Sequence, residues 1–124
     1  MSRTVAIIGA SADRSKFGNK SIRAHLQAGY SVIPIHPTAS EIEGLPCFPS
    51  IEAVTVRLDR VSLYVPPHVG TKLLEAIAAK RPAELWVNPG AESQALLERA
   101  RELGLKPILD CSIVDLGLSP SQFP

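Results

Sequence analysis

The sequence predicts a Rossmann-like α/β fold: a five-stranded parallel sheet with strand order 3-2-1-4-5 between two layers of helices. Two observations carry this prediction. Short β-branched runs alternate with longer segments of helical period, which is the pattern of βαβ units. Gly9 also follows the first apolar run directly, where a parallel strand has to turn into its crossover. The winding direction of such a sheet changes at its first strand, and we expect a crevice at that strand's carboxyl end.

The first half of the chain is predicted to form strands at residues 5–8 and 31–35, with a helix at residues 18–28 between them. Both strands are short runs rich in Val and Ile. The helix would turn Ile22 and Leu26 inward, because these apolar residues lie one turn apart, and Gly29 would end it. A proline-rich connection follows, with a short helical turn near residues 50–54.

The second half repeats this alternation. Strands are predicted at residues 60–65, 85–87 and 107–109. Helices are predicted at residues 68–79, with the apolar face Leu73, Leu74 and Ile77, and at residues 92–103, ended by Gly104. The tail that begins at Ser112 is apolar enough to pack back on the domain, and an exposed or partner-bound tail is an equal alternative.

Composition limits the class of protein. The 124 residues are 45% hydrophobic and 20% charged, with a formal net charge of +1, which fits one globular domain over residues 1–124. This charge balance argues against a nucleic-acid or membrane-surface binder. Neither a secretory leader nor an apolar stretch long enough for a membrane span is recognised, so we expect a cytoplasmic protein. Cys47 and Cys111 are expected to be free thiols, and no metal-ligand spacing occurs.

The residues that follow each predicted strand are candidates for a ligand site, because ligands of such sheets bind beyond the carboxyl ends of the strands. These stretches are Gly9–Ser11, His36–Thr38, Pro66–His68, Asn88–Ser93 and Asp110–Ser112. Gly9 permits a tight turn, and Gly18 and Asn19 stand where the N–H groups of the first helix should point into the loop, an arrangement that favours a phosphate. Three basic residues could add charge there, namely Arg14, Lys16 and Lys20.

Two common phosphate sites are excluded by spacing. A P-loop needs Gly-Lys followed by Ser or Thr, and Asn19 separates Gly18 from Lys20. A dinucleotide site needs G-x-G-x-x-G and an acidic residue after the second strand, where this chain has GAS and His36. Pro66 and Pro67 instead form a stiff apolar wall suited to an adenine or an alkyl arm. The turn "NPG" at residues 88–90 should place a second helix N-terminus at the crevice.

With these residues the chain resembles the CoA-binding domain family, whose members occur alone and as the first domain of the succinyl-CoA synthetase α-subunit and related acyl-CoA ligases. The likeness covers about residues 4–117. The motifs that carry it are "VAIIGAS…FG", "GYSVIPIHP", "EIEGLPCFPSIEAV", "LYVPP", "NPGAES" and "DCSIV". No single motif is specific, whereas their order and spacing are.

The resemblance implies CoA or acyl-CoA as the ligand and assigns roles by position. The pyrophosphate loop maps to Gly9, Ala10, Ser11, Arg14, Lys16, Phe17, Gly18 and Asn19. The ribose or 3′-phosphate end maps to His36 and Pro37, and the adenine side to Val65, Pro66 and Pro67. The pantetheine path maps to Asn88, Pro89, Gly90 and Cys111. Many members carry a lysine after the proline of the second strand end; Thr38 stands there, so a ligand without the 3′-phosphate is an alternative.

The expected role is non-catalytic binding of CoA or acyl-CoA, as a carrier, a sensor or the partner of an enzyme. None of His25, His36 and His68 matches the phosphorylated histidine of the ligases, and His25 is expected at the surface or half-buried. Two other roles remain open. One is a regulatory or protein-interaction domain that binds another nucleotide weakly, and the other is an enzyme that uses Cys111, the only candidate nucleophile, on thioesters.

Overall fold

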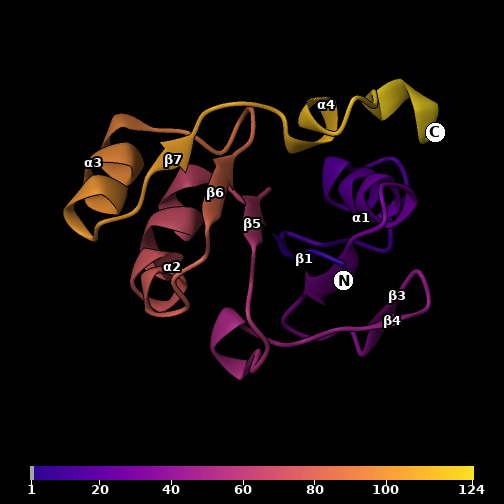
Figure 1. The fold of residues 1–124 in the computed structure, drawn as a ribbon, viewed down its shortest axis with the longest axis horizontal. Coiled ribbons are helices and arrows are strands. Elements are labelled where there is room, and N and C mark those ends of the chain that lie inside the picture. Colours follow the sequence, from indigo (N-terminus) through magenta and orange to yellow (C-terminus); the bar gives the residue numbers. More distant parts are fainter. Residues whose placement is uncertain (1) are drawn as a thin grey trace.

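The computed structural model describes residues 2–124 as a central sheet between two helical layers (Figure 1). The elements in chain order are β1 (Thr4–Ile8), α1 (Phe17–Gln27), β2 (Ser31–Ile35), β3 (Glu41–Ile42), β4 (Leu45–Pro46), β5 (Arg60–Leu63), α2 (Pro67–Ala79), β6 (Glu84–Val87), α3 (Gln94–Glu102), β7 (Pro107–Ile108) and α4 (Ser112–Asp115), with 3₁₀ turns at Ile51–Ala53 and Pro120–Gln122. Helices α2 and α3 cover one face of the sheet, and α1 and α4 cover the other. No helix in the described range is long and apolar enough to cross a membrane.

The five-stranded parallel sheet confirms the predicted class, but the strand order differs from the prediction. The strands lie in the order β2-β1-β5-β6-β7, which is 2-1-3-4-5 by their place in the chain. The expected order 3-2-1-4-5 is therefore wrong in the position of the third strand. That strand, β5, pairs with β1 on the side away from β2, with Ile8 opposite Leu63.

Pro34 explains why β2 lies at the edge of the sheet. A proline has no N–H to donate, so it fits a strand only where one side needs no donor. Pro34 pairs with Ile7 of β1, and its carbonyl oxygen on the outer side accepts a hydrogen bond from the N–H of Phe48 at 3.0 Å. The connecting segment thus covers the edge of β2 that the predicted order would have given to β5.

The face under α2 and α3 carries the larger apolar core. Ten strand and helix residues of this core are at most 3% exposed, namely Ala6, Ile8, Val61, Leu63, Leu85, Val87, Leu74, Ile77, Leu96 and Ala100. Leu74 and Ile77 lie on the predicted face of α2, which is confirmed, while Leu73 is half-buried. Burial of this face supplies most of the hydrophobic stabilisation of the domain.

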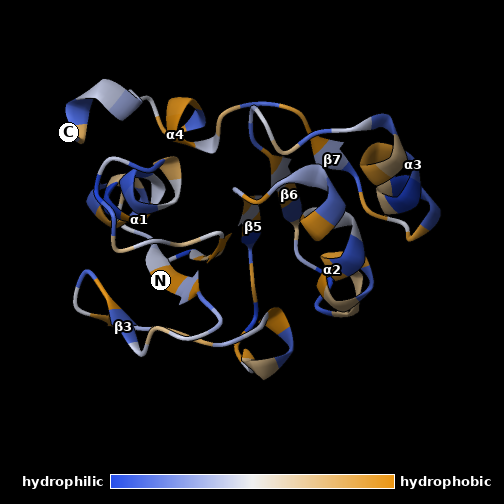
Figure 2. Ribbon diagram, turned by 180° about the vertical axis from the view of Figure 1, so that it is seen from behind, coloured by the Kyte–Doolittle hydropathy of each residue, from blue (hydrophilic) through white to orange (hydrophobic). Residues whose placement is uncertain are grey.

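The face under α1 carries a smaller apolar cluster around Ile22, and the part of this face next to β5 is polar, which was not predicted. Figure 2 shows hydrophilic colours over much of α1. Ile22 is buried as expected, but Leu26 is 39% exposed and His25 is 0% exposed, so the expectations for these two residues are wrong. The reason lies in β5, whose alternate side chains Arg60 and Ser62 are buried and polar on this side and require polar partners from the helix.

The C-terminal tail packs back on the domain. Ile113 and Phe123 are buried against Ala24 of α1, so the first of the two alternatives for the tail is confirmed.

The two-residue turn between β3 and β4 consists of Glu43 and Gly44, both with positive φ (52° and 76°), as a tight hairpin turn requires. This hairpin was not predicted.

Candidate functional site

The carboxyl ends of β1 and β5 lie side by side at the point where the sheet changes its winding direction. From β1 the chain crosses to α1 on one face, and from β5 it crosses to α2 on the other (Figure 1). A crevice lies between these two crossings, lined by Gly9 and Tyr64. Gly9 has φ +95° and lies against the backbone of Tyr64, where a Cβ would be 2.7 Å from the Tyr64 carbonyl oxygen. Glycine is therefore required for the turn out of β1.

Helix α1 begins at this crevice with unpaired donors. Lys16 is its N-cap residue and caps no N–H with its side chain. Within residues 2–124, the N–H groups of Phe17 and Gly18 have no hydrogen-bond acceptor, and the Lys16 amine has no ion-pair partner. Free N–H groups and the positive end of the helix dipole favour an anion, and Lys16 adds a full positive charge.

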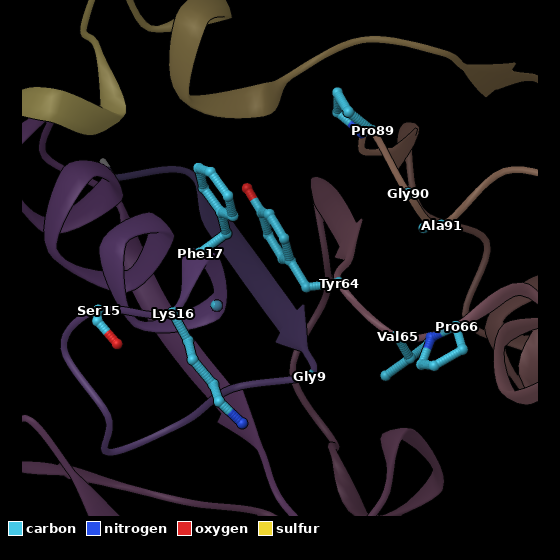
Figure 3. A pocket seen from close by; sticks show the side chains of 11 residues that line it. Gly9, Ser15, Lys16, Phe17, Tyr64, Val65, Pro66, Pro89, Gly90 and Ala91 are labelled. Carbon is cyan, nitrogen blue, oxygen red and sulfur yellow. The ribbon is translucent and has the colours of Figure 1, made fainter.

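One cavity at this crevice, cavity A, has a volume of about 520 Å³. Its lining residues are Gly9, Ser15, Lys16, Phe17, Gly18, Tyr64, Val65, Pro66, Pro89, Gly90 and Ala91. Figure 3 shows the rings of Phe17 and Tyr64 beside each other, with Lys16 extending below them and Pro89 across the space. Cavity A is therefore a candidate site that combines the positive charge of Lys16 with apolar and aromatic walls.

The second cavity, cavity B, has a volume of about 400 Å³. Its lining residues are Ile8, Gly9, Ala10, Ile35, His36, Pro37, Pro49, Ser50, Ile51, Val65, Val69 and Leu73. Gly9 and Val65 line both cavities, so cavities A and B meet at the end of β1. No Asp, Glu, Lys or Arg side chain lines cavity B.

His36 lines cavity B in a defined tautomer. Its Nδ1 accepts hydrogen bonds from the N–H groups of Thr38 (3.1 Å) and Ala39 (2.9 Å). A nitrogen that accepts two such bonds carries no proton, so in the neutral ring the proton is on Nε2. His36 thus holds the turn after β2 with one nitrogen and offers a donor with the other.

Arg14 and Asn19 shape the loop and line neither cavity. The Arg14 guanidinium pairs with Glu43 of the β3–β4 hairpin (Nε to Oε2, 3.4 Å). Asn19 is fully buried and donates to the carbonyl oxygen of Ser11 at 2.8 Å and to Glu43 at 3.1 Å, while its Oδ1 accepts from Nε of Arg23. These bonds fasten the loop between α1 and the hairpin.

The Asn88 side chain belongs to a buried network and does not face the crevice. Its Nδ2 donates to Ser62 Oγ and to the carbonyl oxygen of Leu63, both at 2.8 Å, and its Oδ1 accepts from the N–H of Ser112 at 2.9 Å. All its polar atoms have partners within the fold. Asn88 therefore ties β5 and β6 to the start of α4.

The "NPG" turn does not present the expected open helix N-terminus. Helix α3 begins at Gln94, two residues later than predicted, and Ser93 caps it by accepting a hydrogen bond from Leu96 N–H at 3.1 Å. The Glu92 carboxylate accepts from the N–H of Gly90 at 2.8 Å, within the turn that precedes the helix. The expectation of a second helix N-terminus at the crevice is wrong, because no residue of α3 lines either cavity.

Tyr64 is an aromatic lining residue that was not predicted from the sequence. Its hydroxyl lies 3.0 Å from Ser112 Oγ, and burial raises the pKa of Tyr64 above its usual value. Residues 60, 62 and 64 alternate as Arg, Ser and Tyr in the third strand and its extension, which was the available signal that one face of this strand is polar.

The structure brings most of the predicted site residues together. Eleven of them line cavity A or B: Gly9, Ala10, Lys16, Phe17, Gly18, His36, Pro37, Val65, Pro66, Pro89 and Gly90. Six do not: Ser11, Arg14, Asn19, Pro67, Asn88 and Cys111. Cys111 is half-buried at the start of α4 and packs with the cluster around Ile113 and Phe123. Among the described residues, no group of His, Cys, Asp and Glu could hold a metal ion.

The comparisons with known proteins identify the family. A family model described as a CoA binding domain matches residues 3–117. The chain belongs to this CoA-binding domain family. Over 78 residues the domain is 31% identical to acetate–CoA ligase [ADP-forming] I of Archaeoglobus fulgidus. The aligned residues make up 63% of this chain and only 11% of the ligase. It is also 25% identical over 116 residues to the uncharacterized protein YneT of Bacillus subtilis, covering 90% of this chain and 83% of YneT.

Solved structures of similar proteins agree with the fold. A conserved hypothetical protein of Pyrococcus furiosus is 31% identical, with a TM-score of 0.83, covering 91% of this chain and 98% of that one. The dinucleotide-forming acetyl-coenzyme A synthetase 1 of Ca. Korarchaeum cryptofilum, solved with phosphate and ADP, is 28% identical with a TM-score of 0.75. That match covers 86% of this chain and 25% of the synthetase, so the domain corresponds to one part of a larger enzyme.

Proposed function

We propose that this CoA-binding domain binds CoA or an acyl-CoA without transforming it. The diphosphate lies at the start of α1, the adenosine enters cavity B, and the pantetheine arm lies in cavity A. The observation that carries the proposal is the junction of the two cavities: Gly9 lines both, and beside it are the free N–H groups of Phe17 and Gly18 and the amine of Lys16. CoA has the matching layout, with a charged diphosphate between a purine nucleoside and a long, largely uncharged arm.

The walls of the cavities support a binding role. Cavity B is largely apolar, as a purine requires, and cavity A offers the Phe17 and Tyr64 rings to the pantetheine arm or to an acyl chain. Neither lining contains Asp, Glu or Cys, and the only histidine, His36, uses one ring nitrogen to hold its own turn. These linings supply no activated nucleophile and no pair of carboxylates for acid–base chemistry.

We propose that the bound CoA serves another protein. The ligase and synthetase relatives carry a matching domain as a small part of a much longer chain. A separate domain of this kind can act as a carrier or sensor of acyl-CoA, or as the partner of an enzyme that does the chemistry. The alternative of a regulatory or protein-interaction domain makes a different prediction: such a domain would still bind its protein partner after a substitution that abolishes CoA binding.

Thermal unfolding in the presence of CoA, acetyl-CoA, NAD and ATP tests the proposal. A ligand at millimolar concentration that binds with micromolar affinity should raise the free energy of unfolding by about 4 kcal/mol. CoA and acetyl-CoA are expected to give this shift and NAD a smaller one. If CoA does not stabilise the protein, the proposed function is wrong, whatever NAD and ATP do.

A further inference from the structure

We infer that cavity B selects an adenosine whose ribose carries no phosphate, so that the domain binds dephospho-CoA at least as tightly as CoA. The inference rests on the proposed function, because it concerns the nucleoside end of the same site. Its basis is the distribution of charge and of hydrogen-bond donors around cavity B.

The lining of cavity B offers no counter-charge to a phosphate. Its walls are formed by Ile, Val, Leu, Ala and Pro side chains with the backbone of Gly9, and its polar side chains are those of His36 and Ser50. A phosphate moved from water to such walls loses hydration that nothing replaces. A purine ring and neutral ribose hydroxyls carry no such cost.

His36 offers the ligand a single ring nitrogen. Its Nδ1 already accepts hydrogen bonds from the N–H groups of Thr38 and Ala39, so only Nε2 is open to the nucleoside. Its Nε2–H can donate to a ribose hydroxyl, and a hydroxyl is a suitable acceptor for a neutral donor.

Two basic side chains, those of Arg14 and Lys80, have partners within the fold. Arg14 pairs with Glu43, and the Lys80 amine donates to the carbonyl oxygens of Glu52 and Val54 below the 3₁₀ turn. Lys16 lines cavity A and not cavity B, so its charge serves the diphosphate. The positive charge of Lys16 is thus positioned to interact with the diphosphate of the ligand and not with a phosphate on its ribose.

Calorimetric titration of the full chain with CoA, dephospho-CoA, ADP and adenosine 3′,5′-bisphosphate tests the inference. We expect dephospho-CoA to bind as tightly as CoA or more tightly, and ADP to bind more tightly than the bisphosphate, at low and at high salt. CoA binding about tenfold tighter than dephospho-CoA would overturn the inference and leave the proposed function intact. Binding of ADP without either CoA form would instead overturn the proposed function and support the nucleoside assignment. Absence of binding by all four ligands would overturn both.

Two substitutions at His36 separate its two nitrogens. In H36N the amide oxygen can replace Nδ1 as the acceptor of the turn, but no donor reaches the Nε2 position. In H36Q the amide reaches the Nε2 position, but the turn loses its acceptor. We expect H36N to keep the stability of the protein and to lose about tenfold in affinity for dephospho-CoA, as for one lost hydrogen bond to a ligand. Unchanged affinity in H36N would contradict the role of His36 at the ribose.

A gain of charge provides the converse test. Thr38 is exposed and directly follows Pro37, which lines cavity B, so T38K adds an amine beside the nucleoside end. We expect T38K to improve the affinity for CoA about tenfold relative to dephospho-CoA. Lys72, exposed on α2 beside Leu73, is the control, and K72M should leave the ratio of the two affinities as it is. An unchanged ratio in T38K, or a fall in CoA affinity in K72M, would show that the ribose lies elsewhere.

Discussion

Gly18 lies directly against the carbonyl group of Gly9: a Cβ on Gly18 would be 2.0 Å from the Gly9 carbonyl oxygen. This contact sets the first turn of α1 on the end of β1 and so aims the free N–H groups of the helix at the crevice. The oxygen is backbone at the end of a central strand and cannot move aside as a flexible side chain would.

We expect Gly18→Ala to destabilise the protein by about 3 kcal/mol, because the added methyl group must push α1 away from the sheet. Gly70→Ala is the matched control, since Gly70 is also a buried helical glycine, but its Cβ would meet only the ends of side chains, the nearest being the Cδ1 of Leu96 at 3.1 Å. The better helix propensity of Ala offsets that contact, so Gly70→Ala should be close to neutral. Urea unfolding measures both, and equal losses in the two variants would contradict the proposed packing.

Lys16→Met should weaken CoA binding about tenfold by removing the charge at the start of α1. The loss should shrink as salt is raised, because the contact is electrostatic and partly exposed. Lys20→Met, one turn along α1 with its amine over the Phe17 ring, is the control and should bind as the wild type does. Titration calorimetry at two salt concentrations distinguishes the two variants. An equal loss of CoA affinity in both would indicate that the positive charge of the whole region attracts CoA and that Lys16 makes no specific contact with it.

Cys111→Ala should leave the affinity for acetyl-CoA unchanged, because Cys111 lines neither cavity. Phe17→Ala, which removes a ring from the wall of cavity A, should weaken it. Hydrolysis of acetyl-CoA by the wild-type protein is the measurement that tests the alternative of an enzyme that uses Cys111 on thioesters. If acetyl-CoA is hydrolysed by the wild type and not by Cys111→Ala, the non-catalytic role is wrong.

The domain should lose stability in mild acid because of His25. Burial, together with the nearby Arg60 guanidinium, lowers the pKa of His25 from 6.5 to about 4. Between these values the unfolded chain binds a proton that the folded chain does not, so this stabilisation is complete above pH 6.5 and is lost as the pH falls towards 4. From about pH 7.5 to about pH 5 the free energy of unfolding should fall by about 2 kcal/mol.

Urea unfolding at a series of pH values tests this, with His25→Asn as the comparison. That variant removes the titrating ring, so its stability should be lower overall but should change little over the same range. The pKa of Glu84 is also lowered, through hydrogen bonds from Trp86 and Arg60 that outweigh its desolvation, but that carboxylate contributes at lower pH. A wild-type profile that is flat above pH 5 would contradict the assignment to His25.

Much of the site could be predicted from the sequence because its residues follow strand ends. In a parallel sheet all carboxyl ends meet at one edge, so Gly9, His36, Pro66 and Gly90 had to gather there whatever the order of the strands. The directions of the polar side chains could not be predicted in this way. Asn88 stands at a strand end as well, yet it turns inward because Ser62 and Ser112 offer it buried partners.

The sequence by itself determined the alternation of strands and helices, the glycine turn after β1 and the membership of the CoA-binding domain family. These features are local or lie in a fixed order along the chain. The tertiary structure alone decided that β5 pairs with β1, that α1 buries polar residues against β5, and that Arg14 pairs with Glu43 instead of facing the cavities. Hydrophobic periodicity specifies which residues of an element are apolar, whereas strand neighbours and hydrogen-bond partners depend on segments that only the folded chain brings together.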